Sequence, residues 1–389
     1  MFKKFNKRYN RKPSFNFHAR PKSKALDNSL LVRKGTDAKT QVQYVAKNQF
    51  SNLLISSQLK QNIQEKGYMN PTPIQDQVIP EALNGRDVIG VANTGTGKTG
   101  AFLIPLINKA FYNRSQRVLI IAPTRELATQ IDEECRAFAK GMGIFTTLAI
   151  GGVSMYHQTS ALKKRPQFVI GTPGRLKDFE RQGKLQLSTF QNTVLDEVDR
   201  MMDMGFINDI RFLISKLPKE RQSLFFSATI PRESQSLMHI FLSNPITISV
   251  KKQDTPEAVE QNIVKINGRN KVDVLHGLLQ QEGFTKVLVF GRTKWGMEKL
   301  ARVLSNRGVR VAAIHGNKSQ AQRQRALDQF RHNQIQVLVA TDVASRGLDI
   351  DEVTHVVNYD QPPSYEDYIH RIGRTGRMNK KGFALTFVE

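Results

Sequence analysis

Short apolar runs alternate with helix-like patterns along most of the chain. In the first half, the apolar runs cover residues 86–91, 117–122, 145–150, 167–171, 192–196 and 223–227. Stretches such as 125–139 and 231–242 separate them and have the apolar spacing of helices. Because buried apolar strands that alternate with helices form parallel sheets covered on both faces, the pattern predicts an α/β fold.

The alternation occurs twice, with a polar interruption over residues 251–257. It resumes with apolar runs at 286–290, 309–314, 336–340, 355–359 and 382–388. We therefore predict one α/β domain over residues 41–250, a linker over 251–259 and a second α/β domain over 260–389. A chain of 389 residues suits two domains, at roughly 100–200 residues for each.

Residues 1–40 have a different composition, with twelve Lys or Arg against two Asp, and carry +10 of the net charge of +24. Aromatic residues are interleaved with the basic ones at Phe2, Phe5, Tyr9, Phe15 and Phe17. Because the segment has neither a helix nor a strand period, we predict a disordered tail. Basic and aromatic side chains together favour binding of single-stranded nucleic acid. The alternative is a solubilising tail without a fixed partner.

The charge of the whole chain indicates a polyanionic partner, with nucleic acid first and an anionic membrane surface second. No apolar run approaches the roughly 20 residues that a membrane-spanning helix needs, and the basic amino terminus lacks the apolar core of a secretory signal. The single cysteine, Cys135, excludes an internal disulfide and a cysteine-cluster metal site. It shares a helical spacing with Leu127, Ile131 and Phe138, so we predict that it packs in the core. A reducing compartment, and hence a cytoplasmic location, is expected.

A candidate phosphate-binding loop, Ala-Asn-Thr-Gly-Thr-Gly-Lys-Thr, covers residues 92–99 between a predicted strand and a predicted helix start. Gly95 and Gly97 let the backbone bend so that several N–H groups converge at the positive end of the helix dipole. Lys98 can then reach the β- and γ-phosphates, and the Thr99 hydroxyl can bind Mg²⁺. The strict pattern has glycine where this loop begins with alanine, so the interpretation depends on the Gly-Lys-Thr ending and its context. The alternative is a Gly/Thr-rich surface turn that binds nothing.

The second candidate is the acidic sequence Asp196-Glu197-Val198-Asp199, which follows an apolar strand. Ligands of open parallel sheets bind at the carboxyl ends of strands. Asp196 can hold Mg²⁺ there, and Glu197 can orient and deprotonate an attacking water. Such clusters are often solvated loops, but the phosphate loop upstream favours the catalytic interpretation.

Two further motifs are candidates for the site. One follows the strand over residues 223–227, and the other lies near the end of the second domain. Ser227 and Thr229 carry hydroxyls that could bond to the acidic cluster, although a helix cap is the alternative. The segment 370–377, His-Arg-Ile-Gly-Arg-Thr-Gly-Arg, could place guanidinium groups where charge develops on a γ-phosphate. Its alternatives are a basic RNA-facing loop or a solvated turn.

These motifs, in this order, make residues 48–388 resemble the DEAD-box ATP-dependent RNA helicases of superfamily two. The resemblance implies two tandem RecA-like parallel-sheet domains, with nucleotide and RNA bound between them. Val198 stands where the family has alanine, while the three acidic residues keep their places. The family usually continues a little beyond the last expected strand, so the final helix of the second domain is expected to be missing and no accessory domain to follow.

The resemblance also assigns roles by position. Phe50 would stack on adenine, Gln75 would hydrogen-bond its edge, and Asp349 would contact the ribose. The residues expected to hold ATP are Phe50, Gln75, Thr94, Gly95, Thr96, Gly97, Lys98, Thr99, Asp349, Arg374 and Arg377. The residues expected in catalysis are Lys98, Asp196, Glu197, Arg374 and Arg377, with Mg²⁺ on Thr99 and Asp196. The residues expected to bind RNA are Thr124, Arg125, Gly152, Thr172, Gly174, Arg175, Arg323 and Thr341, and those expected to couple the sites are Asp199, Ser227, Thr229 and His370.

The function this implies is an ATP-dependent RNA helicase that binds the RNA backbone without regard to sequence. It would unwind short duplexes locally, or remodel RNA–protein complexes such as ribosomal precursors or decay machinery, with ATP and Mg²⁺ as cofactors. A monomer without a membrane partner is expected. The alternatives are an RNA-annealing or clamp protein that acts mainly through the tail, and a DNA helicase of the same superfamily. A general nucleotide-binding scaffold would leave the complete catalytic set without a use.

Overall fold

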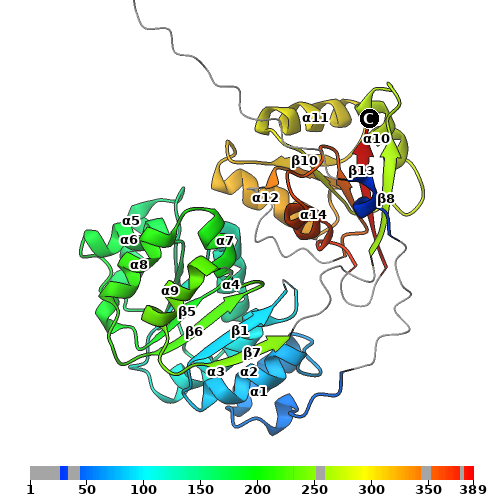
Figure 1. Cartoon of the computed structure of the whole chain (residues 1–389). Helices are drawn as coiled ribbons and strands as arrows, with labels where there is room; N and C mark the ends of the chain where they lie inside the picture. Colours follow the sequence, from blue (N-terminus) through cyan, green and yellow to red (C-terminus); the bar gives the residue numbers. More distant parts are fainter. Residues whose placement is uncertain are drawn as a thin grey trace, which may run out of the picture.

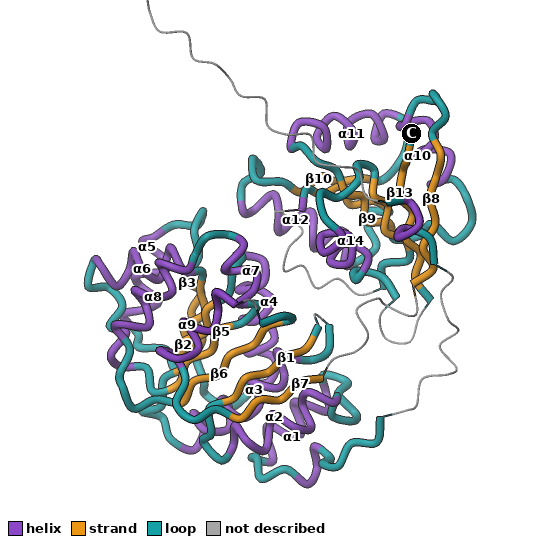
Figure 2. The backbone as a smooth tube through the Cα atoms, viewed as in Figure 1, coloured by secondary structure: helices purple, strands orange, loops and turns teal. Residues whose placement is uncertain are grey.

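The computed structural model describes residues 27–33, 44–93, 95–230, 232–250, 259–342, 352–376 and 381–389. Two α/β bodies are present, which we call lobe one (residues 44–250) and lobe two (residues 259–389) (Figure 1). In each lobe the strands form a central sheet between helices (Figure 2).

Lobe one is built on a seven-stranded sheet in which every neighbouring pair of strands is parallel. From edge to edge the strands are β3 (Thr146–Ala149), β4 (Phe168–Gly171), β2 (Val118–Ile121), β5 (Asn192–Leu195), β6 (Gln222–Ser227), β1 (Val88–Ala92) and β7 (Ile246–Val250). Because all strands run the same way, their carboxyl ends meet at one edge of the sheet, where ligands bind in folds of this kind.

Helices cover both faces of this sheet. They are α1 (Ser57–Glu65), α2 (Pro73–Leu83), α3 (Lys98–Tyr112), α4 (Arg125–Phe138), α5 (Met155–Lys163), α6 (Pro173–Arg181), α7 (Val198–Asp203), α8 (Ile207–Lys216) and α9 (Arg232–Phe241), with short 3-10 helices η3 (Phe50–Asn52) and η4 (Leu187–Thr189). Successive strand residues point to opposite faces, so Val118 and Ile120 pack with α1–α4 while Leu119 and Ile121 pack with α6–α9. This is why the strands read as continuous apolar runs in the sequence.

Lobe two repeats the plan with six parallel strands. From edge to edge they are β10 (Val311–Ile314), β11 (Val337–Ala340), β9 (Val287–Phe290), β12 (His355–Asn358), β13 (Gly382–Val388) and β8 (Val259–Lys265). The described helices are α10 (Lys271–Leu279), α11 (Lys294–Asn306), α12 (Gln320–Arg331) and α14 (Tyr365–Ile372). The predicted α/β class with two tandem parallel-sheet domains is confirmed.

Two edge strands, β7 and β8, were not predicted from the sequence. Each lies at a sheet edge and is largely exposed or half-buried, with only Ile248, Val259 and Gln261 buried, so neither forms a continuous apolar run. β7 ends at Val250, where we placed the end of the first domain, whereas β8 begins at Val259, the last residue of the predicted linker. Residues 251–258 lie outside the described residues.

The prediction that residues 1–40 are disordered is wrong for residues 27–33. Asn28–Leu31 form the 3-10 helix η1, whose amino end is capped by the Asp27 carboxylate, which accepts from the Ser29 N–H at 2.9 Å. Arg33 then pairs with Gln261 of β8 in an antiparallel bridge. Figure 1 shows η1 in blue beside β8, on the lobe that does not contain α1 and α2. Contacts with β8, which is distant in the sequence, stabilise this element, so its residues show neither a helix nor a strand period.

Within the described ranges, every helix is too short or too polar to cross a lipid bilayer. Cys135 is fully buried in the core of lobe one, as predicted from its spacing, and burial raises the pKa of its thiol well above the usual value.

Candidate active site

The phosphate loop connects the carboxyl end of β1 to the amino end of α3. Gly95 has φ 80° and Gly97 has φ 91°, in the left-handed region that residues with a side chain rarely adopt. A Cβ on Gly97 would also lie 2.6 Å from the Gln75 side-chain nitrogen. Both glycines are therefore required by geometry, as the sequence predicted. Thr96 closes the turn by donating to the Asn93 carbonyl at 2.8 Å.

Lys98 begins α3 and is buried, with 6% of its surface exposed. Its Nζ donates to the Ala92 carbonyl at 2.9 Å, at the carboxyl end of β1. The same ammonium group acts electrostatically on Asp196 at the end of β5, so it lies between the loop and the acidic motif. Thr99 follows it on the first turn of α3, and Thr94 lies outside the described residues.

Gln75 joins the loop to helix α2. Its Oε1 accepts from the Thr72 N–H at 3.0 Å, which completes a capping box, and its Nε2 donates to the Gly97 carbonyl at 3.0 Å. Gln75 is fully buried, so these bonds fix its amide group beside the phosphate loop.

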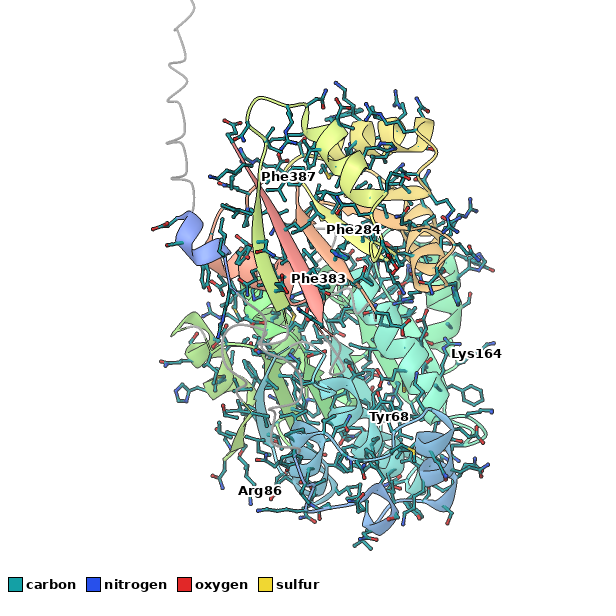
Figure 3. All side chains as sticks on the ribbon, turned by 90° about the vertical axis from the view of Figure 1, so that its right-hand side faces the viewer. Tyr68, Arg86, Lys164, Phe284, Phe383 and Phe387 are labelled. Atoms are coloured by element: carbon teal, nitrogen blue, oxygen red, sulfur yellow. The ribbon has the colours of Figure 1, made fainter. Side chains whose placement is uncertain are left out.

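Phe50 lies in the same part of lobe one, with 6% of its surface exposed. Its ring meets the edge of Tyr68, with 6.4 Å between ring centroids; Figure 3 labels Tyr68. A Cβ on Gly100 of α3 would lie 2.8 Å from the Gln75 amide and 3.4 Å from the Tyr68 ring. The structure therefore brings Phe50, through Tyr68, next to Gln75 and the start of α3.

Asp196 ends β5 with 2% of its surface exposed. Burial raises the pKa of this carboxyl to about 7; Glu197 and Asp199 add to the rise, while Lys98 and the Glu197 N–H oppose it. A cation beside the carboxylate would favour its charged form.

Glu197 adopts a left-handed backbone conformation (φ 52°), which is strained for a residue with a side chain. Its side chain is 4% exposed, and Arg200 Nη1 lies 3.3 Å from Oε2 without forming a directional hydrogen bond. Its carboxylate is thus buried and incompletely satisfied.

The donor set fits Mg²⁺ of a phosphate-loop enzyme. One carboxylate, Asp196 after β5, and one hydroxyl, Thr99 in the first turn of α3 after β1, lie at the same edge of the sheet. Among the described residues, no three His, Cys, Asp or Glu side chains gather as a metal-binding group. Mg²⁺ typically binds through one or two protein groups, with phosphates and water completing its coordination.

Asp199 connects the acidic motif to the end of β6. Its Oδ2 accepts from the Ala228 N–H at 3.1 Å, the Thr229 N–H at 3.0 Å and the Thr229 hydroxyl at 3.3 Å. The Asp199 N–H donates to the Ser227 hydroxyl at 3.2 Å. The predicted bonds between the hydroxyls and the acidic cluster are present. Val198 is fully buried in the core between them, so the larger side chain is accommodated by packing.

The lobe-one residues predicted to bind RNA follow three adjacent strands. Thr124 follows β2, Gly152 follows β3, and Thr172 and Arg175 follow β4. Arg125 lies across Gly152, where a Cβ would come within 2.1 Å of its guanidinium. Arg175 Nη1 donates to the Val153 carbonyl at 3.4 Å; burial lowers the pKa of Arg175, and Arg125 lowers it further. At Gly174, an added Cβ would meet no heavy atom of the described residues within 4 Å, which leaves room there for a ligand.

Lobe two supplies α14, which carries His370 and Arg371. Burial lowers the pKa of His370, and Arg200 lowers it further while Asp199 opposes the shift, so the imidazole lies near the acidic motif of lobe one. Arg371 is 3% exposed and binds both carboxylate oxygens of Asp342, at 2.6 and 2.8 Å. It is a structural anchor of the motif, a role that the sequence did not reveal.

Of the five other site residues predicted in lobe two, the structure describes three. Arg374 is 4% exposed within lobe two, where it lines a small cavity with Glu352 and Lys381. Thr341 is buried just beyond the end of β11. Asp349 and Arg377 lie outside the described residues.

A contact between the lobes was missed by sequence reasoning. Arg323 of α12, predicted to bind RNA, lies 3.0 Å from the Glu126 carboxylate of α4, and Gln320 donates to the same carboxylate oxygen at 3.2 Å. Glu126 is 2% exposed. An acidic residue inside a motif otherwise assigned to RNA was the available signal, but its partner is almost two hundred residues away in the chain.

Comparison with known proteins agrees with this geometry. The family model for DEAD/DEAH box helicases matches residues 72–237, and the model for the helicase conserved C-terminal domain matches residues 270–379. ATP-dependent RNA helicase CshA of Listeria monocytogenes is 44% identical over 342 residues, which cover 87% of this chain and 66% of the relative. CshA of Limosilactobacillus reuteri is 43% identical over 341 residues, which cover 87% and 69%. This chain thus spans about two thirds of the length of these relatives.

A solved structure of Saccharomyces cerevisiae Dbp5 bound to RNA and ADP BeF3 is 31% identical, with a TM-score of 0.77 over 88% of this chain and 89% of that chain. The similarity covers both lobes, in agreement with the paired family matches. The chain belongs to the DEAD-box helicase family.

Proposed function

We propose that this chain is an RNA-stimulated ATPase that separates short RNA duplexes or remodels RNA–protein complexes. The observation that carries the proposal is the position of the acidic motif. Lys98 of the phosphate loop lowers the pKa of Asp196, while Arg200 lowers and Asp199 raises the pKa of His370 in lobe two. A hydrolytic centre at the boundary between two lobes can respond to whatever holds them together.

Lobe one provides the nucleotide site in this proposal. Phe50 stacks on adenine, and Gln75 reads its edge, because an amide both donates and accepts. Lys98 and the N–H groups of the loop hold the phosphates. Thr99 and Asp196 hold Mg²⁺, which when bound would neutralise phosphate charge. Glu197 aligns a water and takes its proton.

RNA lies across the ends of β2, β3 and β4 in lobe one. Arg125 and Arg175 offer guanidinium groups, and Thr124 and Thr172, both at helix amino ends, offer hydroxyl and N–H groups to successive phosphates. Arg323 and Thr341 extend the surface from lobe two. Such contacts do not read bases, so binding is independent of sequence.

Closure of the lobes on ATP and RNA completes the site. Arg374, Arg377 and Asp349 then reach the nucleotide, and the bonds of Asp199 transmit the change from the acidic motif to β6. Bending of the bound strand separates a short duplex, and hydrolysis reopens the cleft. The functional units are residues 41–250 and 260–389 with a linker at 251–259, acting as a monomer in the cytoplasm on RNA alone or in RNA–protein complexes.

The test measures ATP hydrolysis with and without single-stranded RNA, single-stranded DNA and short RNA duplexes. RNA is expected to stimulate the parent more than DNA does, and Lys98→Ala and Glu197→Gln are expected to lose activity by about 100-fold or more. Glu65→Gln, which removes an exposed charge paired with Lys140 at 3.1 Å, is the matched control and should behave like the parent. Parent-like hydrolysis by Glu197→Gln would show that another group is the base, and indifference to RNA would end the proposal.

A further inference from the structure

The segment that leads to Phe50 is attached to helix α2 by one carboxylate. Asp76, in the first turn of α2, is 3% exposed. Its Oδ2 accepts from the Tyr44 hydroxyl at 2.5 Å and from the Lys47 N–H at 2.8 Å. Its Oδ1 accepts from both the N–H and the side-chain amide of Asn48, each at 2.8 Å. A single side chain therefore holds three positions of the segment.

These bonds are the main attachment of the segment. None of the described residues 44–49 is buried, and Val45 is 83% exposed, so apolar packing contributes little before Phe50. Burial by itself would raise the pKa of Asp76, but the hydrogen bonds from Tyr44, Lys47 and Asn48 lower it below its usual value. The acceptor thus remains ionised, and hydrogen bonds to an ionised acceptor are about twice as strong as neutral ones.

Gln75, the residue before Asp76, binds the phosphate loop. Gln75 donates to the Gly97 carbonyl at 3.0 Å, while Asp76 holds the backbone two residues before Phe50. One helical turn therefore sets the distance between the loop that holds phosphates and the ring that meets the base.

We propose that Asp76 is a positioning residue of the nucleotide site, whose carboxylate fixes the segment carrying Phe50 and thereby sets the preference for adenine. This inference rests on the proposed function, in which Phe50 stacks on adenine. The Asp76 oxygens are already occupied by donors of residues 44–48, so its role is to position the segment and not to bind a ligand.

The main test is Asp76→Asn. The substituted amide offers one oxygen and one NH₂ group, so part of the donor set would face another donor. We expect the KM for ATP to rise about tenfold. The ratio of kcat/KM for ATP to kcat/KM for GTP should fall about tenfold, because the free energy of a hydrogen bond to a charged group corresponds to a change of about that factor. The kcat at saturating ATP and RNA should stay within about twofold, because the catalytic groups are untouched.

Two milder variants test the same contact. Tyr44→Phe removes one hydroxyl donor from a residue that is 43% exposed, and should shift the ATP-to-GTP ratio in the same direction by a smaller factor. Asp76→Glu restores a carboxylate and should recover part of the ratio that Asp76→Asn loses.

Asp87→Asn is the matched control. Asp87 is also a buried carboxylate of lobe one that accepts from two backbone N–H groups, those of Ser223 and Ser243, each at 2.7 Å. It precedes β1, at the end of the sheet away from the phosphate loop. Its substitution should lower the Tm without changing the ATP-to-GTP ratio.

Phe50→Ala, measured alongside, separates the inference from the proposed function. If Phe50→Ala lowers the ratio while Asp76→Asn and Tyr44→Phe leave it unchanged, the role of Asp76 is overturned and the adenine site stands. If Phe50→Ala leaves the ratio unchanged, the assignment of Phe50 fails and the role of Asp76 fails with it. Should Asp76→Asn fail to fold, an unchanged ratio in Tyr44→Phe overturns the inference.

Discussion

His355 of β12 lies between two aromatic rings in lobe two, both labelled in Figure 3. Its ring stacks on Phe284 with 3.7 Å between centroids and on Phe383 with 4.9 Å. Burial lowers the pKa of His355 from 6.5 to about 4. The imidazole therefore acts as a neutral core side chain at physiological pH.

This burial predicts an acid sensitivity of lobe two. The folded protein resists protonation of His355, whereas the unfolded chain does not. The contribution of neutral His355 to the free energy of unfolding is therefore complete above pH 6.5 and is lost as the pH falls towards 4. Between pH 7.5 and 5 the loss should be about 1–2 kcal/mol, allowing for solvent screening. His355→Phe keeps the stack and should remove that part of the pH dependence.

Hydrogen–deuterium exchange of the β9 and β12 backbone amides, followed with increasing denaturant, measures the stability of lobe two at each pH. Replacement of the exposed His332 by Phe is the control and should leave the pH dependence as in the parent. An equal acid sensitivity in His355→Phe and the parent would contradict the prediction.

Residues within local motifs were predictable, whereas their distant partners were not. The phosphate loop and the acidic motif each fit in a few consecutive residues, so Lys98 and Asp196 could be read from the sequence. Asp76 and Glu126 directly follow predicted site residues in the chain. They bind Asn48 and Arg323, which only the folded chain brings near. The sequence shows that a buried carboxylate needs a partner, but it does not show which residue that partner is.

At the scale of elements, η1 is a clip that joins residues before lobe one to lobe two. Leu31 is fully buried in a cluster with Val259, Tyr368, Ile372 and Ala384. The N–H of Arg33 donates to the Gln261 carbonyl at 2.9 Å, and the Gln261 N–H donates back at 2.8 Å. The clip thus covers part of the β8 edge and packs on α14, which carries His370.

We expect Leu31→Ala to destabilise lobe two by about 2–4 kcal/mol, because a fully buried leucine is truncated and a cavity remains. Val32→Ala, at the adjacent residue with 50% exposure, is the matched control and should change stability by less than about 0.5 kcal/mol. Denaturant unfolding followed by hydrogen–deuterium exchange of the β9 and β12 amides measures the effect of both substitutions. Equal effects of the two substitutions would show that the clip does not hold lobe two.

Elements with a repeated pattern were predicted, and those that depend on one contact were not. The strands from 86–91 to 382–388 are mostly apolar runs, and the structure has a strand at each. β7 and β8 are largely exposed edge strands, and η1 is held by the Leu31 side chain and the Arg33 bridge to β8. The period of a sequence shows what a segment buries along its whole length, so it does not detect a segment held by a few long-range contacts.

At the scale of the whole molecule, charge is concentrated before the clip. Residues 1–26 contain nine Lys or Arg and no acidic residue. Deletion of residues 1–26, which leaves Leu31 in place, should weaken RNA binding and flatten the slope of log K against log salt. Filter binding or fluorescence anisotropy over roughly 50–300 mM salt measures this slope. An unchanged slope would leave these residues as a solubilising tail.

The contact between the lobes yields the last prediction. Arg323 and Gln320 of α12 share the carboxylate of Glu126 in α4, at 3.0 and 3.2 Å, and Glu126 is 2% exposed. A second pair, Arg331 with Glu133, is longer at 3.5 Å, and its side chains are 25% and 52% exposed. Because loss of one partner from a buried pair leaves an uncompensated charge, the two pairs should differ strongly in strength.

Glu126→Gln should therefore increase the mean separation of the lobes in the RNA-free protein, as measured by small-angle X-ray scattering. It removes the ionised partner of Arg323, so opening of the lobes no longer requires breaking this ion pair. Glu133→Gln, which removes the exposed pair, should leave the scattering as in the parent. Arg323→Ala should open the lobes like Glu126→Gln but weaken RNA binding, because it also removes a positive charge expected to meet the RNA backbone. If Glu126→Gln and Glu133→Gln scatter alike, the buried pair does not set the arrangement of the lobes, and closure depends on ATP and RNA alone.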